Sequence, residues 1–114
     1  MGKGNIEIDY DEIEDILYIS KSSEKSKFSI DISTPQGDIV IDFDHKGLVT
    51  GIEMFNASKH FPLVDNKKIE KVDFNINYGH KWLSIQLLFY IPGINQPLIT
   101  NIYSPYNKEV IINA

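Results

Sequence analysis

The sequence predicts a mainly β fold, either an antiparallel meander or a two-sheet sandwich of short hairpins, with an α+β arrangement as the alternative. Apolar and polar residues alternate with a period of two over most of the chain, which is the period of a strand that buries one face. Turn-forming residues separate these alternating runs at short intervals. One short helix is expected near residues 56–61, because Asn56 can cap it and Pro62 cannot continue it.

Five strands are expected in the first half of the chain. They cover residues 6–10, 16–20, 28–33, 39–43 and 48–55. Pro35 stands at the second position of the turn over residues 34–37, where its fixed φ is favourable. Gly47 closes the turn that begins at Asp44, and a type I turn with a bulge needs a left-handed residue there. Gly51 lies inside the last of these strands, which predicts a bulge or a close backbone approach.

Strands are expected again in the second half of the chain. They cover residues 72–78, 82–91 and 98–103, with a short edge strand at residues 110–112. Gly79 and His80 are expected to be the two central residues of a hairpin turn, because glycine suits the first central position. A further helical turn is expected at residues 65–70, with Asp65 as its cap.

The expected strand at residues 82–91 is apolar on both faces. Such a strand belongs at the centre of a sheet that is covered twice, or in an interface between subunits. Hairpin-rich domains also leave open sheet edges, which natural proteins cover or pair. We therefore expect a homodimer.

Length and composition limit the class of protein. A chain of 114 residues is expected to form a single domain over residues 1–114, in which a second set of strands at residues 69–113 packs on a hairpin module at residues 6–58. The chain has no cysteine, which excludes disulfides and thiolate metal sites. No leader-like segment and no apolar run of membrane-spanning length is present. A cytoplasmic protein without membrane contact is therefore expected.

The charged residues argue against nucleic acid as a partner. The net charge is −5, and all 11 basic residues are lysine. Arginine supplies the planar fork that reads phosphate and guanine edges, and a negative chain is repelled by a polyanion. The lysines are scattered along the chain without a basic stripe. An acidic surface without arginine instead suits a basic protein partner or a divalent cation.

A series of short motifs in the first half resembles a known family. The motifs are Tyr10-Asp11, Asp15 with Leu17-Tyr18, and Asp42-x-Asp44-x-x-Gly47-x-x-x-Gly51-Ile52-Glu53. Together they resemble the family catalogued as domain of unknown function 2283, over residues 6–58. Members of that family are often encoded beside small toxin-like proteins, so the resemblance implies an antitoxin-like role in which the protein neutralises a partner.

The sequence offers six candidate binding residues. They are Asp11, Asp15, Tyr18, Asp42, Asp44 and Glu53. Acidic side chains in turns also accept hydrogen bonds from nearby backbone N–H groups, so a structural role is favoured for the aspartates. Strand alternation places both Asp42 and Asp44 on the solvent face. Burial of Glu53 beside Tyr18 or Asp15 would raise its pKa, as a general acid requires, although a structural role is favoured there too.

A divalent-cation site is the alternative use of the acidic residues. Asp11 and its neighbours could supply hard oxygen ligands, together with Asp42 and Asp44 from another hairpin. However, the regular spacing and central glycine of a calcium loop are missing, and Asp9 is expected to face away from the turn at Asp11. No metal site is therefore predicted.

Recognised catalytic motifs are missing from the sequence. The three histidines are too dispersed for a zinc signature, and there is no nucleophile elbow and no phosphate-binding glycine loop. No catalytic residue and no cofactor are predicted. The sequence favours a non-enzymatic protein-interaction module, with antitoxin-like binding of a small basic partner as one form of it. The alternative is a divalent-metal-binding protein or a metal-dependent enzyme that uses the Asp/Glu cluster.

Overall fold

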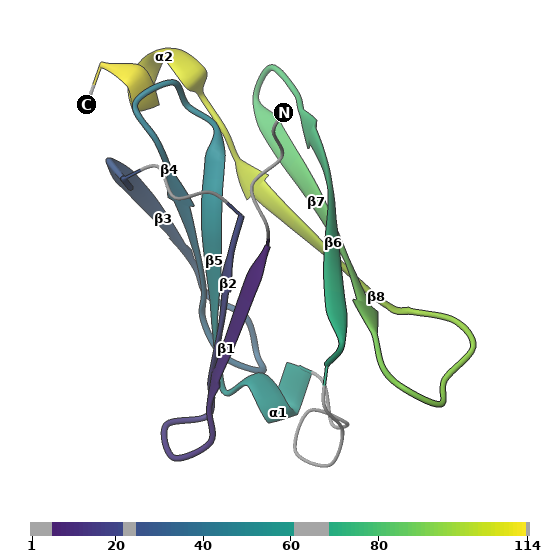
Figure 1. The fold of residues 1–114 in the computed structure, drawn as a ribbon. Helices are drawn as coiled ribbons and strands as arrows, with labels where there is room; N and C mark the ends of the chain where they lie inside the picture. The colour runs from purple at the N-terminus through teal and green to yellow at the C-terminus, as the bar shows by residue number, and fades with distance from the viewer. Residues whose placement is uncertain (1–5, 22–24, 61–68, 114) are drawn as a thin grey trace.

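The computed structural model describes residues 6–21, 25–60 and 69–113, which form eight strands and two short helices (Figure 1). The strands make a five-stranded and a three-stranded sheet, and every strand pairing is antiparallel. The mainly β class and the two-sheet arrangement predicted from the sequence are confirmed. Alternation causes this arrangement, because each strand turns its apolar side chains toward one face.

The larger sheet contains the strands of the first half in the order β1-β2-β5-β4-β3. Their bounds are β1 Glu7–Asp11, β2 Ile16–Ser20, β3 Phe28–Ile32, β4 Ile39–Phe43 and β5 Val49–Phe55. β3, β4 and β5 form a meander, whereas the β1-β2 hairpin joins the sheet through a pairing of β2 with β5. That pairing joins segments far apart in the sequence, and it places Tyr18 opposite Glu53.

The turn between β4 and β5 has the geometry predicted from the sequence. The N–H group of Gly47 donates to the carbonyl oxygen of Asp44 at 3.0 Å, and the N–H group of Asp44 donates to the carbonyl oxygen of Leu48 at 2.9 Å. Gly47 has a φ of +81°, which is the left-handed conformation that a type I turn with a bulge requires.

The smaller sheet is a meander of β6 Lys71–Tyr78, β7 Trp82–Tyr90 and β8 Leu98–Pro105. Its first turn lies one residue later than the sequence predicts. The N–H group of Gly79 donates to the carbonyl oxygen of Trp82 at 2.9 Å, so the two central residues are His80 and Lys81. Glycine is needed before them because a Cβ atom at Gly79 would lie 2.5 Å from the carbonyl oxygen of Trp82.

Two short helices lie at opposite ends of the sandwich, α1 over Ala57–His60 and α2 over Lys108–Ile112 (Figure 1). α1 confirms the helix predicted near residues 56–61. The edge strand predicted at residues 110–112 is wrong, because this segment belongs to α2. The Asn107 side chain caps α2 by accepting a hydrogen bond from the N–H group of Val110 at 3.2 Å. This cap offsets the strand preference of the β-branched residues that follow.

None of the helices in the described parts of the chain is long and apolar enough to cross a membrane. The helical turn expected at residues 65–70 lies outside the described residues over 65–68, and Ile69 and Glu70 are not helical.

The core lies between the two sheets. Leu17, Ile41 and Ile52 of the larger sheet belong to the same buried cluster as Leu83 and Ile85 of the smaller one. Each such aliphatic side chain contributes about 1.5–3 kcal/mol when it is removed from water. The inner faces of both sheets are thus occupied by packing, and the outer faces are the surfaces left for function.

Candidate functional site

The outer face of the larger sheet gathers most of the candidate residues. Paired residues of neighbouring strands share a face, and the pairings place Asp9 beside Tyr18, Tyr18 beside Glu53, and Asp42 beside Gly51. A shallow depression of about 400 Å³ lies there, and its lining residues are Asp9, Asp11, Ile16, Tyr18, Asp42 and Glu53. Four of the six predicted site residues therefore meet in one place.

Tyr18 lines this depression opposite Asp9 and Glu53. A Cβ atom at Gly51 would be 3.1 Å from the carbonyl oxygen of Ile19 and 3.5 Å from the hydroxyl oxygen of Tyr18, so glycine gives the phenol its space. The predicted close backbone approach at Gly51 is thereby confirmed. The pairing register between β4 and β5 also shifts beside Gly51, because Thr50 is not paired with a residue of β4. Burial raises the pKa of the Tyr18 hydroxyl, and the charges of Asp42 and Glu53 raise it further.

Glu53 is half-buried beside Tyr18, one of the two neighbours considered from the sequence. Burial raises the pKa of its carboxyl group, and the nearby Asp42 carboxylate adds to the effect. Asp42 in turn accepts a hydrogen bond of 2.5 Å from the Ser29 hydroxyl on β3. The depression therefore holds carboxylates that repel one another across neighbouring strands.

We use the name acidic face for the outer carboxylates of the larger sheet with Tyr18. These carboxylates are Glu7, Asp9, Asp11, Asp31, Asp42 and Glu53. The five strands contain no lysine, arginine or histidine at all. Among the described residues the recorded ion pair joins Lys71 and Asp73, which lie on the smaller sheet. The acidic face therefore has no compensating cation from its own strands.

Asp9 was missed by the sequence reasoning. Its side chain lines the depression together with Asp11, so the expectation that it faces away was wrong. The signal was available, because residues two apart in a strand share a face. Asp11 has a second role, since its Oδ1 accepts hydrogen bonds from the N–H groups of Ile13 at 3.0 Å and Glu14 at 3.1 Å. It thus organises the β1-β2 turn, as acidic turn residues commonly do.

Asp15 lies away from the depression and has a structural role. Its carboxylate accepts hydrogen bonds from the Tyr10 hydroxyl at 2.8 Å, the Ser58 hydroxyl at 2.7 Å and the Ser58 N–H group at 3.0 Å. Its carbonyl oxygen accepts from the N–H group of Ala57 at 2.9 Å. Asp15 therefore caps α1 from the neighbouring hairpin, in place of the predicted cap Asn56, whose φ of 54° is left-handed.

The pKa of Asp15 reflects this role. Burial raises the pKa of the carboxyl group, but the hydrogen bonds from Ser58 and Tyr10 favour the ionised form more strongly. The result is a pKa below the ordinary value of an aspartate.

Asp44 is also separate from the depression. Its side chain is only 5% exposed, so its predicted position on the solvent face is wrong. β4 ends at Phe43, and strand alternation does not extend into the turn that follows. Its Oδ1 accepts from the N–H groups of Lys46 at 2.9 Å and Leu48 at 3.0 Å, which fixes the β4-β5 turn.

A metal centre has no counterpart in the described residues. Within residues 6–21, 25–60 and 69–113, no group of three or more acidic or histidine side chains is placed to hold a metal ion. Asp15 and Asp44, which the metal hypothesis would use, are both engaged by hydrogen-bond donors of the fold.

Comparisons with known proteins show that the larger sheet is similar to proteins of unknown function. Residues 7–58 match the family described as protein of unknown function (DUF2283), which confirms the resemblance expected for residues 6–58. Uncharacterized protein MJ0789 of Methanocaldococcus jannaschii is 48% identical over 56 residues, which are 49% of this chain and 45% of that protein. The chain thus spans about half the length of this relative. No solved structure matches the chain.

The matched segment and the acidic face coincide. Residues 7–58 contain all five strands of the larger sheet and the start of α1, whereas the smaller sheet lies outside the match.

Proposed function

We propose that this protein is a non-enzymatic interaction module that binds a basic partner protein through its acidic face. The observation that supports the proposal is the charge of the larger sheet, whose strands carry outward carboxylates and no basic residue. Such a surface attracts a basic partner over long distances and increases the rate of encounter.

The depression supplies the specific part of the proposed interface. Glu53 and Asp42 raise each other's energy when both are ionised, and a lysine or arginine of a partner would remove that repulsion. Tyr18 pairs with Glu53 across neighbouring strands and is 38% exposed. A central tyrosine surrounded by polar groups is a common arrangement at the centre of protein interfaces.

Ile16 provides an apolar contact at the margin of the same depression. Ile16 and Tyr18 would both lose contact with water on binding, and this burial would contribute to the affinity independently of salt. The antitoxin-like role implied by the family resemblance is one form of this binding, with a small basic protein as the partner.

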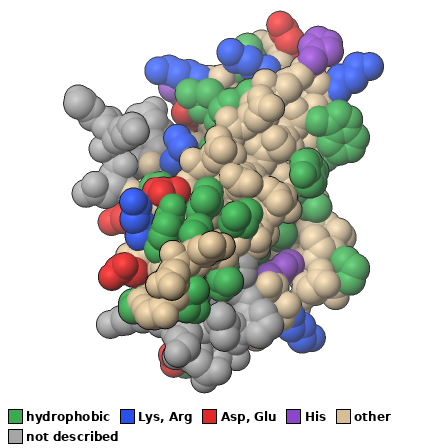
Figure 2. Space-filling view, turned by 90° about the vertical axis from the view of Figure 1, so that its right-hand side faces the viewer, with side chains coloured by type: hydrophobic (Ala, Val, Ile, Leu, Met, Phe, Trp, Pro, Cys, Tyr) green, Lys and Arg blue, Asp and Glu red, His purple; other side chains and the backbone are tan. Residues whose placement is uncertain are grey.

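We also propose that two copies of the chain associate through the outer face of the smaller sheet. Trp82, Ile99 and Tyr103 are 61%, 53% and 65% exposed on this sheet. Ser84 pairs with Tyr103, and Leu88 pairs with Ile99, so β7 and β8 present these side chains together. Figure 2 shows this side of the molecule, where few charged side chains lie over the strands.

Charge supports this choice of surface for self-association. Two acidic faces would repel each other, whereas the exposed residues of β7 and β8 are uncharged. Self-association through the smaller sheet would leave the acidic face free for the basic partner.

The proposed function is tested by comparing three immobilised proteins in a pull-down from the native host. The test variant carries Asp42→Asn and Glu53→Gln, and the control variant carries Glu70→Gln and Asp73→Asn, which changes the net charge equally on the other sheet. We expect the wild-type protein and the control to retain a basic protein that the test variant loses. Equal capture by all three proteins, or no capture of a basic protein, would contradict the proposal.

A further inference from the structure

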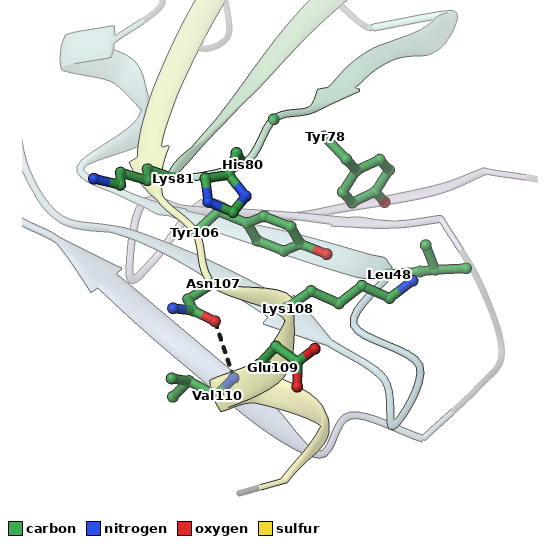
Figure 3. Close-up of a pocket in the computed structure, with 10 residues that line it drawn as sticks. Leu48, Tyr78, His80, Lys81, Tyr106, Asn107, Lys108, Glu109 and Val110 are labelled. Atoms are coloured by element: carbon green, nitrogen blue, oxygen red, sulfur yellow. Dashed lines mark hydrogen bonds between the residues drawn. The ribbon is translucent and has the colours of Figure 1, made fainter.

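A pocket of about 680 Å³ lies at one end of the sandwich, beside α2 (Figure 3). Three segments that are distant in the sequence form it. They are Leu48 at the β4-β5 turn, Tyr78 to Lys81 at the end of β6 and in the turn that follows, and Tyr106 to Val110 before and within the start of α2. Its volume lies within the range of small-molecule sites. Most of its residues lie outside the segment that matches the family.

One wall of the pocket is aromatic and fixed in place. The Tyr78 hydroxyl accepts a hydrogen bond from the N–H group of Val49 at 2.9 Å, and the Tyr106 hydroxyl donates one to the carbonyl oxygen of Gly47 at 2.6 Å. The two ring centroids are 5.5 Å apart at an interplanar angle of 55°. Burial raises the pKa of both hydroxyls, and the buried Asp44 carboxylate adds to this, so both phenols stay neutral.

The rim of the pocket is basic. His80 and Lys81 come from the β6-β7 turn, and Lys108 comes from the start of α2. Figure 3 shows the Lys108 side chain extending past Tyr106 toward Leu48. Its stem is packed, because a Cβ atom at Gly47 would lie 3.2 Å from the Lys108 Cγ. In Figure 3 the Lys108 ammonium group lies on the Leu48 side of the pocket, and the Lys81 side chain extends to the opposite side.

These cations lack carboxylate partners in the described structure. The recorded ion pair among the described residues joins Lys71 and Asp73, so neither Lys81 nor Lys108 takes part in one. Glu109 is the acidic residue that lines the pocket. In a chain with a net charge of −5, this end gathers basic side chains, and Figure 2 shows lysine and histidine at the corresponding end of the molecule.

We propose that this pocket binds a small organic anion with a flat apolar body. The carboxylate or phosphate head lies at the rim beside His80, in the positive field of Lys81 and Lys108, and the apolar body lies against Tyr78 and Tyr106. Lysines act as point charges rather than as planar forks, so either type of head is accepted. This site is independent of the acidic face and uses none of its residues.

The proposal is tested by following backbone amide chemical shifts by NMR during titrations with four probes. Benzoate and phenyl phosphate combine a flat body with a negative head, benzamide has the body without the charge, and inorganic phosphate has the charge without the body. We expect saturable shifts at residues 78–81 and 106–110 for benzoate and phenyl phosphate, and much weaker binding for the other two. Equal binding of benzamide or inorganic phosphate, or no saturable shift at these residues, would overturn the proposal.

Lysine variants test which side chains recognise the negative charge of the ligand. Lys81→Gln combined with Lys108→Gln removes two solvent-exposed partners of the anion, so the dissociation constant for benzoate should rise about tenfold. Lys71→Gln removes a lysine of the same sheet outside the pocket and should leave benzoate binding unchanged. A cooperative thermal unfolding transition of each variant is the check that it is folded. An unchanged dissociation constant in the double variant would overturn the proposal, and variants of the acidic face should bind benzoate as the wild-type protein does.

Discussion

The hydroxyl group of Tyr106 donates a hydrogen bond of 2.6 Å to the carbonyl oxygen of Gly47, and this bond joins the segment after β8 to the β4-β5 turn. Gly47 lies inside the segment that matches the family, whereas Tyr106 lies outside it. The two parts of the chain are thus connected by a buried polar contact as well as by the apolar core.

Tyr106→Phe should lower the free energy of unfolding by about 1–2 kcal/mol. The substitution removes the donor and leaves the carbonyl oxygen of Gly47 without it in a buried position, where lost hydrogen bonds are costly. Urea denaturation measures the effect. Tyr103→Phe is the matched control, because the Tyr103 side chain is 65% exposed. Equal midpoints for the two variants would show that the Tyr106 bond does not stabilise the fold.

Gly47→Val should destabilise the protein by about 1–3 kcal/mol, through both strain and crowding. Its φ of +81° is unfavourable for valine, and a Cβ atom would lie 3.2 Å from the Lys108 Cγ and 3.3 Å from the Tyr106 hydroxyl oxygen. Gly93→Val separates the two causes, because Gly93 has a φ of +84° and nothing within 4 Å of its Cβ position. We expect the larger loss at position 47 in denaturant midpoints, and a larger loss at position 93 would contradict the crowding.

Asp15→Asn should lower the stability near neutral pH by about 1–2 kcal/mol, because an amide oxygen cannot accept all three hydrogen bonds of the carboxylate. The pKa of Asp15 is lower in the folded than in the unfolded state. Its stabilising contribution is therefore complete above the unfolded value of about 4 and is lost as the pH falls through the folded value. Unfolding measured across this acidic range should show a smaller pH dependence for the variant, and parallel curves would contradict the assignment.

Glu53→Gln should have the opposite effect and stabilise the protein near neutral pH by up to about 1 kcal/mol, since solvent screens this half-buried group. The pKa of Glu53 is raised in the folded state, so its ionised form weakens the fold above that pKa. The gain should disappear in acid, where the carboxyl group is protonated. Glu12→Gln, in the exposed β1-β2 turn, is the control and should change little. A loss of stability at neutral pH would show that Glu53 has a structural role instead.

Ile99→Lys should prevent self-association, because it places a charge at the centre of the proposed contact between two smaller sheets. Sedimentation equilibrium at high micromolar concentration measures the effect. Ile13→Lys is the control, since Ile13 is 93% exposed on the β1-β2 turn, away from that sheet. A wild-type protein that is strictly monomeric, or a dimer that survives Ile99→Lys, would contradict the proposed surface.

Local sequence patterns predicted most of the fold. They failed at positions where two such patterns favour different structures. Alternation identified every strand of both sheets, and glycine chemistry identified the turn at Gly47. The segment at residues 110–112 has strand-forming side chains, but the Asn107 cap decides its structure. At Asp44 the error came from extending alternation past the end of a strand.

The sites depend on topology, which local patterns do not contain. The sequence left Tyr18 and Asp15 open as neighbours of Glu53, and only the strand pairings bring Asp9 and Asp42 to the same depression. The basic pocket was not predicted, because Leu48, Lys81 and Lys108 meet through the packing of the two sheets. In the sequence these lysines are merely scattered.

The inner face of the larger sheet depends on the smaller sheet for its burial. Leu17, Ile41 and Ile52 are fully buried in the core shared with the smaller sheet. Residues 7–58 alone would therefore expose these apolar side chains to water. Any protein that carries this segment must therefore supply an apolar cover from elsewhere in its chain or from a partner. In this chain the smaller sheet is that cover, so loss of the smaller sheet would expose the inner face of the larger sheet to water.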